Sequence, residues 1–327
     1  DEYDYVIVGS GAAASVLASR LGEDRSIKVC VLEAGPPDSN PFIRIPAGFM
    51  KTIFDTSVTY QYQTEPGEGT AGRQVNVVQG RTVGGGSSVN GMLYVRGQKQ
   101  DYDAWAAAGN PGWSYVDVVP YFMRSETRHG PGDDRVRGRS GPLPVSDYRF
   151  EDKLCDAFVK SAEACGVPRT SDYNGVVQFG TGRYQTLIYK RRRVSAAEAF
   201  LHPAVRRGNV DLRTRAMANR IRFEGRKATG VDYIDGDGKT RSVSARRGVI
   251  VSAGSINSPK LLQLSGIGPA DLLKQHGIPV VYDRHSVGDN LRDHYTARHV
   301  YRVKNARSLN DVASGAPLLW QIMKYFL

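Results

Sequence analysis

The sequence is short of cysteine and of long apolar runs. Its 327 residues include only Cys30, Cys155 and Cys165, an odd count without CxxC spacing, which excludes a disulfide framework and favours a reducing compartment such as the cytoplasm. Cys30 lies in an apolar run and is predicted to be a buried thiol. No apolar run reaches about 18 residues, so no transmembrane segment is predicted. The chain starts almost directly on a predicted strand, and no signal peptide is expected.

Several catalytic motifs are also missing. The sequence has no HExxH motif and no Cys–His cluster, and its six histidines follow no ligand spacing, so no metal site is predicted. It has no GxSxG motif, which leaves an esterase-type nucleophile unsupported. Neither internal repeats nor low-complexity tracts occur.

Positive charge is in excess, but the basic residues are spread along the sequence. Lys and Arg outnumber Asp and Glu by 44 to 33. The densest basic clusters, Lys190–Arg193 and Arg246–Arg247, are not interleaved with aromatic residues as single-strand binding requires. We therefore interpret the basic residues as solvated charge and predict no nucleic-acid partner. The length allows one large domain or two linked ones.

A strand–glycine–helix pattern opens the chain. Tyr5–Val8 is typical of a buried parallel strand, and Ala12–Leu21 is predicted to be a helix with an apolar face formed by Val16, Leu17 and Leu21. A second buried strand, Lys28–Leu32, ends on Glu33.

Each residue type in this pattern has a mechanical reason. Gly9 permits a tight turn, Gly11 lets the backbone approach a pyrophosphate, and Ala14 allows the helix to pack closely on the strand. Glu33 is placed to accept hydrogen bonds from a ribose 2′-OH. The pattern predicts an adenine dinucleotide; the alternative is a helix-capping turn with incidental glycines.

A second glycine-rich loop, GRTVGGGSSVNG, covers Gly80–Gly91. Its composition suits either an ordinary loop or close backbone approach to a ligand. A nicotinamide enzyme has no evident need for such a loop, whereas an enzyme that buries a whole flavin does. In that case Gly84–Gly86 would supply backbone amides, Ser87 and Ser88 hydroxyl donors, and Asn90 an amide near the ring.

Four segments carry a family resemblance. Gly80–Asp103 (GRTVGGGSSVNGMLYVRGQKQDYD) and Gly254–Gly268 (GSINSPKLLQLSGIG) resemble the two signatures of the glucose–methanol–choline (GMC) oxidoreductases, which are FAD enzymes. Ser195–Asn209 and Val287–His294 are similar to further family segments. The resemblance runs from residue 4 to about residue 303. Within the family, the motifs are most similar to those of the choline-, sorbose- and aliphatic-alcohol dehydrogenases.

The resemblance implies a set of FAD contacts. They are Gly9, Gly11, Glu33, Arg81, Gly85, Ser88, Asn90 and Gly91, with Ala218 where the family's backbone holds adenine. Some members attach FAD through a His at the position that is Val89 here. The resemblance therefore implies non-covalent FAD.

The resemblance also implies the fold class, α/β: a Rossmann-like FAD-binding domain with a parallel sheet plus a second α+β substrate domain with an antiparallel sheet, both incomplete. We assign residues 1–40, 70–145 and 205–295 to the FAD-binding domain, 41–69 to a segment covering the cofactor, and 146–204 with 296–327 to the substrate domain.

Local patterns predict the remaining elements. Gly130–Gly141 is predicted to be a flexible surface loop, Glu151–Cys165 a helix, and Val210–Ala245 a set of antiparallel strands. Arg247–Ala253 is predicted to be a further buried strand, and it leads into a helix beginning near Ser258 and Pro259.

The implied activity is oxidation of a small-molecule alcohol CH–OH group by hydride transfer to flavin N5, with oxygen or a quinone-like carrier as electron acceptor. None of His129, His202, His276, His285, His294 and His299 can be assigned as the base. The resemblance places the catalytic His and its His or Asn partner beyond Leu327, so we expect a fragment whose missing C-terminal segment is a possible partner chain. Three alternatives stay open: a flavin-holding hydroxynitrile lyase, a non-catalytic FAD-binding fragment, and a nicotinamide dehydrogenase.

Overall fold

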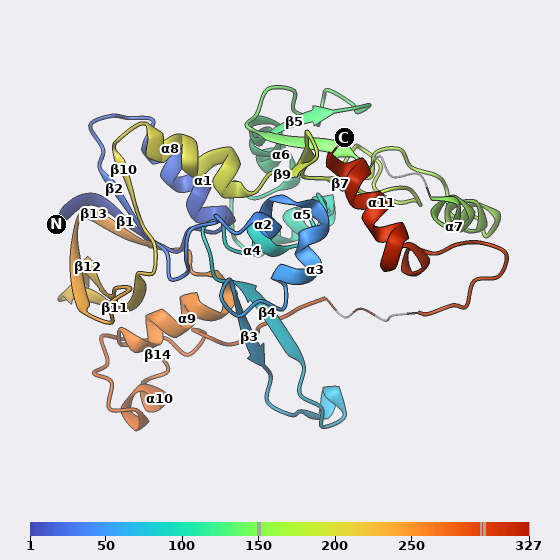
Figure 1. The fold of residues 1–327 in the computed structure, drawn as a ribbon. Helices are drawn as coiled ribbons and strands as arrows, with labels where there is room; N and C mark the ends of the chain where they lie inside the picture. The colour runs from blue at the N-terminus through green and yellow to red at the C-terminus, as the bar shows by residue number, and fades with distance from the viewer. Residues whose placement is uncertain (149–151, 295, 297–298, 327) are drawn as a thin grey trace. The chain divides into compact units, whose positions relative to one another are not determined.

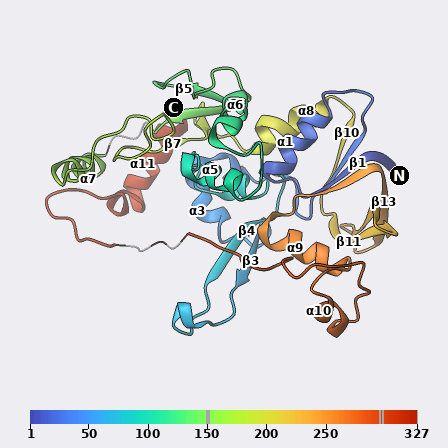
Figure 2. The same cartoon turned by 180° about the vertical axis from the view of Figure 1, so that it is seen from behind.

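The computed structural model describes residues 1–148, 152–294, 296 and 299–326. Its contacts divide the chain into two compact units, which Figures 1 and 2 show from opposite sides. The first unit contains residues 1–92 and 192–292, and the second contains residues 93–191 and 293–327. Residues 93–145 thus fall in the second unit and 192–204 in the first, unlike the predicted ranges; the assignment of ranges to cofactor or substrate stays a prediction.

A six-stranded sheet forms the centre of the first unit, in the order β10-β2-β1-β13-β12-β11. The four parallel strands are β10 (Val210–Arg213), β2 (Val29–Leu32), β1 (Glu2–Val8) and β13 (Thr240–Val251); β12 (Lys227–Ile234) and β11 (Met217–Glu224) are antiparallel to their neighbours. The predicted α/β class with a mostly parallel sheet is confirmed.

Two strand predictions are wrong. The sequence predicts β10 among antiparallel strands, but it pairs in parallel with β2. The last strand of the predicted set Val210–Ala245 and the predicted strand Arg247–Ala253 form one strand, β13, whose first half pairs with β12 and whose second half pairs with β1. The arginine pair Arg246–Arg247 gives the impression of a break, but these side chains extend to the surface and pair with Asp4. The end of β13 is half-buried rather than buried.

The two faces of the sheet have separate cores. On one face Ile7 and Val31 pack against α1 (Ala12–Leu21), the π-helical turn η3 (Ala197–Leu201) and α8 (His202–Arg206). On the other face Val8 and Cys30 pack with Leu261 of α9 (Gly254–Leu264). Cys30 is fully buried as predicted, and burial raises its pKa to about 12.

The predicted apolar face of α1 is only partly correct: Leu21 packs against this core, but Leu17 does not. Small residues, including Ala14 and Ala18, face the core, whereas Leu17 is 37% exposed. Small side chains let the helix axis approach the strands closely. α9 also begins earlier than predicted, at Gly254, with Pro259 inside the helix.

The rest of the first unit surrounds the sheet. Its elements are α2 (Pro41–Arg44), η1 (Pro46–Gly48), α3 (Phe49–Thr52), the hairpin of β3 (Thr59–Gln63) and β4 (Asn76–Gly80) with η2 (Glu68–Thr70), α4 (Gly86–Val89), β9 (Arg192–Arg193), β14 (Ile267–Gly268), α10 (Ala270–Gln275) and β15 (Tyr282–Asp283).

The second unit is built around a three-stranded mixed sheet, β5 (Glu126–His129), β6 (Leu143–Asp147) and β7 (Gln185–Thr186). Its other elements are α5 (Lys99–Ala107), α6 (Tyr115–Ser125), α7 (Lys153–Ala164), β8 (Ile188–Tyr189), η4 (Leu309–Val312) and α11 (Gly315–Phe326). The α7 helix matches the prediction for Glu151–Cys165, although Glu151 itself lies outside the described residues.

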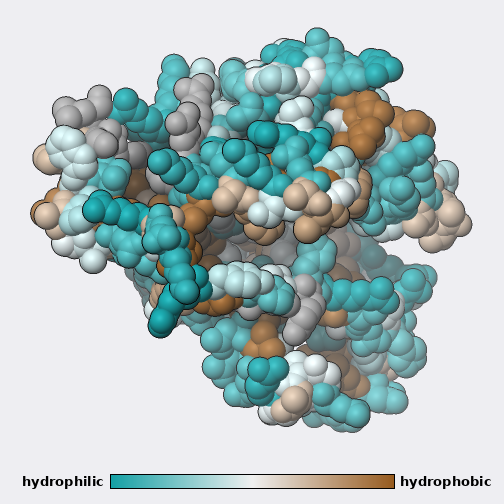
Figure 3. All heavy atoms as spheres, turned by 90° about the vertical axis from the view of Figure 1, so that its right-hand side faces the viewer, coloured by the Kyte–Doolittle hydropathy of each residue, from teal (hydrophilic) through white to brown (hydrophobic). Residues whose placement is uncertain are grey.

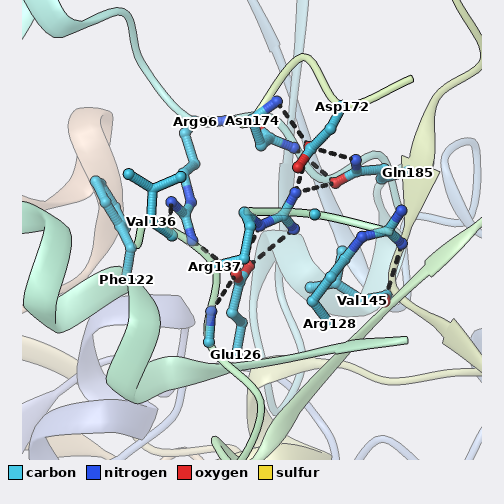
Figure 4. A network of polar contacts seen from close by, with 12 residues as sticks. Arg96, Phe122, Glu126, Arg128, Val136, Arg137, Val145, Asp172, Asn174 and Gln185 are labelled. Carbon is cyan, nitrogen blue, oxygen red and sulfur yellow. Dashed lines mark hydrogen bonds and ion pairs between the residues drawn. The ribbon is translucent and has the colours of Figure 1, made fainter. Parts of the chain in front are cut away.

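The predicted flexible loop Gly130–Gly141 is partly core. Arg137 is 1% exposed, and its guanidinium donates to Glu126 Oε1 at 2.8 Å, to Gln185 Oε1 at 3.0 Å and to Asp172. Figure 4 shows this network, in which Arg96 also reaches Glu126. The polar composition of the loop therefore reflects an internal ion network as well as a surface.

Apolar side chains also reach the surface. In the second unit Phe158, Val177 and Phe179 are each more than two-thirds exposed, and Figure 3 shows brown hydrophobic patches among the teal atoms of the face it displays. Among the described residues, none of the helices combines the length and apolar character needed to cross a membrane.

Candidate cofactor-binding site

A cavity of about 830 Å³ lies at the carboxyl ends of the parallel strands of the first unit. Gly9 follows β1, Glu33 follows β2 and Ser252 follows β13, and all three line the cavity. Ligands of open parallel sheets bind at this edge, and the volume is in the range of cofactor sites.

Two helices begin at the cavity. Ala12 and Ala13 at the start of α1, and Gly254–Ser258 at the start of α9, line its wall. Neither helix has an acidic residue in its first turn or a side-chain hydrogen bond at its N-cap. The first-turn amides and the positive helix ends are therefore available to an anion such as a diphosphate.

The second glycine loop closes against the first. Gly84 N donates to Ser10 O at 3.2 Å. Gly85 has a φ of +54°, and a Cβ on it would lie 2.8 Å from Gly11 Cα. A Cβ on Gly9, whose φ is +92°, would lie 2.5 Å from Ser252 O. Bare backbone thus forms this end of the cavity because side chains would not fit.

Glu33 is a buried carboxylate at the cavity wall. Its oxygens accept from Ser10 N at 3.0 Å, Ser10 Oγ at 2.5 Å and Gly35 N at 2.8 Å. Burial raises the pKa of Glu33, and these hydrogen bonds oppose the rise. The carboxylate therefore fixes the first glycine loop and, with three of its roughly four lone-pair sites used, can still accept from a ligand hydroxyl.

Aromatic rings from the β3–β4 hairpin border the site. Tyr60 lines the cavity and stacks on Tyr62 with 5.3 Å between ring centroids, and Tyr62 Oη donates to Asn257 Oδ1 at 2.9 Å. The Arg81 guanidinium lies over the Tyr60 ring, and Arg81 Nε is buried without a hydrogen-bond partner in the described part of the chain. A hydrogen-bond acceptor on a bound ligand could pair with this buried donor beside the cavity.

Residues 3–296 match the sequence model of the GMC oxidoreductases. The chain belongs to the GMC oxidoreductase family. GMC oxidoreductases are FAD-binding flavoproteins, and the glycine loops, the helix N-termini and the unpaired Arg81 Nε fit a dinucleotide of this kind.

Curated relatives include oxygen-dependent choline dehydrogenases. That of Brucella anthropi is 46% identical over 90% of this chain and 53% of its own length, and that of Sinorhizobium fredii is 47% identical over 89% and 52%. The chain thus spans about half the length of the curated relatives it matches.

Solved structures show the same fold. Pyridoxine 4-oxidase from Mesorbium loti is 35% identical with a TM-score of 0.81, over 86% of this chain and 55% of that one. Aspergillus oryzae formate oxidase is 27% identical with a TM-score of 0.87, over 100% of this chain and 58% of that one.

The structure of this GMC chain brings part of the predicted site together. Gly9, Gly11, Glu33, Gly85 and Ala218 line the cavity. Of the others, Ala14 belongs to α1 and faces the core, and Arg81 lies beside Tyr60. Ser88 Oγ is used within the loop by donating to Val83 O at 2.7 Å. Asn90 and Gly91 are exposed and do not line the cavity.

Sequence reasoning missed several lining residues. Ser10 lies between the two motif glycines and hydrogen-bonds to Glu33, while Gln79 lies in β4 directly before Gly80, where the second loop begins. Asn257 and Lys260 come from α9, inside the second quoted family segment, so the strand–glycine–helix junction is the signal that identifies them.

No histidine is among the residues that line the cavity. His202 Nε2 lies 2.9 Å from Asp38 Oδ2, and this hydrogen bond raises the His202 pKa. His129 stacks on Tyr189 in the second unit. Among the described residues, no group of three or more His, Cys, Asp or Glu is arranged to hold a metal ion.

Proposed function

We propose that this protein binds FAD non-covalently and uses it to oxidise a small alcohol at a CH–OH group. The observation that carries the proposal is the cavity at the ends of β1, β2 and β13, where two glycine loops meet two uncapped helix N-termini. When bound, the flavin would accept the hydride that leaves the alcohol carbon. The chain's own residues would hold the diphosphate at α1 and the ribose at Glu33.

Non-covalent binding is supported by the second loop. Val89, where some members carry the linking His, is an aliphatic side chain that is 5% exposed. It has no nucleophilic atom and packs with Ile43 and Val58. Flavin released into the supernatant after acid precipitation would support this; flavin retained on the precipitate would contradict it.

The names of the relatives suggest the substrate class and the acceptor. We propose choline or a similar small alcohol as the substrate and oxygen as the acceptor. The hydroxyl proton needs a base, and we assign none of the six histidines because none lines the cavity. The exposed free thiols of Cys155 and Cys165 support a reducing compartment such as the cytoplasm.

The test is the anaerobic visible spectrum of the purified protein before and after addition of choline and other primary alcohols. A yellow protein that bleaches supports alcohol oxidation. A yellow protein that no alcohol bleaches overturns the oxidation and favours a lyase or a non-catalytic flavoprotein. A protein that takes up no FAD overturns the cofactor.

A steric variant tests the cavity itself. Gly9→Ala places a Cβ 2.5 Å from Ser252 O in a left-handed backbone conformation, so FAD affinity should fall at least tenfold in a fluorescence titration. Gly67→Ala is the matched control, because no atom lies within 4 Å of its Cβ position and its φ is negative. Equal FAD affinity in the two variants would place the cofactor elsewhere.

A further inference from the structure

Arg193 is a buried arginine directly behind the second glycine loop. It ends β9 and is 4% exposed. Nε donates to Ile43 O at 2.8 Å and Nη1 to Ser87 O at 3.1 Å. Asn90 receives two further bonds, from Nη1 to Oδ1 at 2.8 Å and from Nη2 to the backbone O at 2.7 Å.

All four acceptors are neutral oxygens. Within the described ranges of the chain, no carboxylate forms an ion pair with Arg193. Burial lowers the pKa of Arg193 to about 10, so the guanidinium is still charged at neutral pH. A buried charge without a counter-ion is unfavourable for the fold, and such groups cluster at functional sites.

The charge lies next to an open surface. Three of the four bonds go to Ser87 and Asn90, in the loop whose residues Gly85 and Gly86 line the cavity. Gly86, Asn90 and Gly91 are exposed. A group bound against this exposed side of the loop would therefore experience the positive potential of Arg193.

The same contacts fix the orientation of Asn90. Its Oδ1 accepts from Arg193 Nη1 and from Met92 N at 3.0 Å. Both partners are donors only, so the atom they share must be the amide oxygen. Asn90 is exposed, and its Nδ2 has no hydrogen-bond partner among the residues described, so it is left to donate to a ligand.

We propose that Arg193 is an electrostatic positioning residue of the flavin site: it presents the Asn90 amide to the isoalloxazine ring and stabilises the negative charge that the ring gains on reduction. This inference rests on the proposed function, because it requires FAD at the cavity with its ring against Gly86–Gly91. It assigns no step of the reaction to Arg193 itself.

The experiment measures the flavin reduction potential and the FAD dissociation constant of the purified holoprotein. Arg193→Met removes the charge, and we expect reduced flavin to lose at least tenfold more affinity than oxidised flavin, which lowers the potential by about 30 mV. Arg193→Lys keeps the charge but not the guanidinium geometry, so the potential should be retained while FAD binds less tightly.

Asn90→Asp provides a second route if Arg193→Met does not fold. A carboxylate at residue 90 would pair with Arg193 and neutralise its charge without removing the side chain. The flavin reduction potential should therefore fall by a similar amount, while the thermal stability of the protein stays the same or rises. Arg192→Met is the matched control, since Arg192 is the exposed neighbour on β9 and its loss should leave the potential unchanged.

The outcomes separate this inference from the proposed function. If wild-type protein binds FAD but neither Arg193→Met nor Asn90→Asp lowers the potential, Arg193 is structural and the inference is overturned while the function stands. An equal shift in Arg192→Met would also overturn it, since any nearby cation would then suffice. Failure of the wild-type protein to bind FAD overturns both.

Discussion

The two units of this protein bury arginine in opposite ways. In the second unit Arg96, Arg128 and Arg137 each contact a carboxylate, and Arg137 lies between Glu126 and Asp172 (Figure 4). In the first unit Arg193 contacts only carbonyl and amide oxygens. The burial is similar in the two units, but Arg193 has no carboxylate partner among the described residues.

This difference separates a structural network from a charge that is available to a ligand. In the second unit the arginine and carboxylate charges neutralise one another, so little field extends beyond the network. In the first unit no carboxylate of the described chain pairs with Arg193, and its charge lies beside the candidate site.

The largest expected effect is that of Arg137→Met. The variant leaves Glu126 and Asp172 without their shared partner, and breaking a buried pair in this way costs about 3–5 kcal/mol. All three tryptophans, Trp105, Trp113 and Trp320, lie in the second unit, so tryptophan fluorescence during guanidinium unfolding reports this unit. An unchanged unfolding midpoint would show that the network does not hold the unit together.

Arg193→Met should destabilise the protein less, by about 1–3 kcal/mol, because it leaves neutral acceptors unpaired but no carboxylate. The temperature at which flavin fluorescence is released reports the first unit and should fall, while the tryptophan transition should not move. A loss of stability as large as that of Arg137→Met would mean that Arg193 has an acidic partner after all.

The sequence predicts the local parts of this picture well. The strand, turn and helix of residues 5–21 can be predicted because an apolar run, a glycine pair and a helical pattern follow one another directly in the chain. The cavity glycines Gly9, Gly11 and Gly85 can be predicted for the same reason. A glycine between a strand and a helix usually indicates close approach of the backbone to a ligand or to another segment.

The remainder depends on contacts between distant segments. The run Lys190–Arg193 has the composition of solvated charge, yet Arg193 is buried because the segments holding Ile43 and Asn90 fold around it. Likewise nothing local distinguishes Tyr60 from the other aromatics of residues 41–69. The parallel pairing of β10 is set by the crossover that precedes it rather than by its own residues.

The pH dependence of the second unit is a smaller effect. Burial would raise the pKa of Glu126, but the hydrogen bond from Arg137 and the charges of Arg96 and Arg137 lower it below its ordinary value of 4.5. On acidification the unfolded carboxyl therefore takes up its proton first, and stability is lost as pH falls below 4.5 through the folded pKa.

The check is the tryptophan unfolding midpoint measured over a pH series in wild-type protein and in Glu126→Gln. The variant is less stable at neutral pH but should lose less stability on acidification, because it has no proton to take up at this position. Parallel curves for the two proteins would assign the acid sensitivity to other carboxyls.

The smallest effect on stability is expected for Arg135→Met. This variant is the control for the comparison of buried arginines. Arg135 is two residues from Arg137 in the same polar loop and also pairs with an acid, Asp133, but its side chain is 81% exposed. Water replaces the lost partner of an exposed pair, and the Asp133 carboxylate keeps its hydrogen bond from the backbone N of residue 135. The tryptophan midpoint should therefore stay at the wild-type value. If Arg135→Met and Arg137→Met shift it equally, the loop responds to lost charge alone, and burial is not what separates the arginines of this protein.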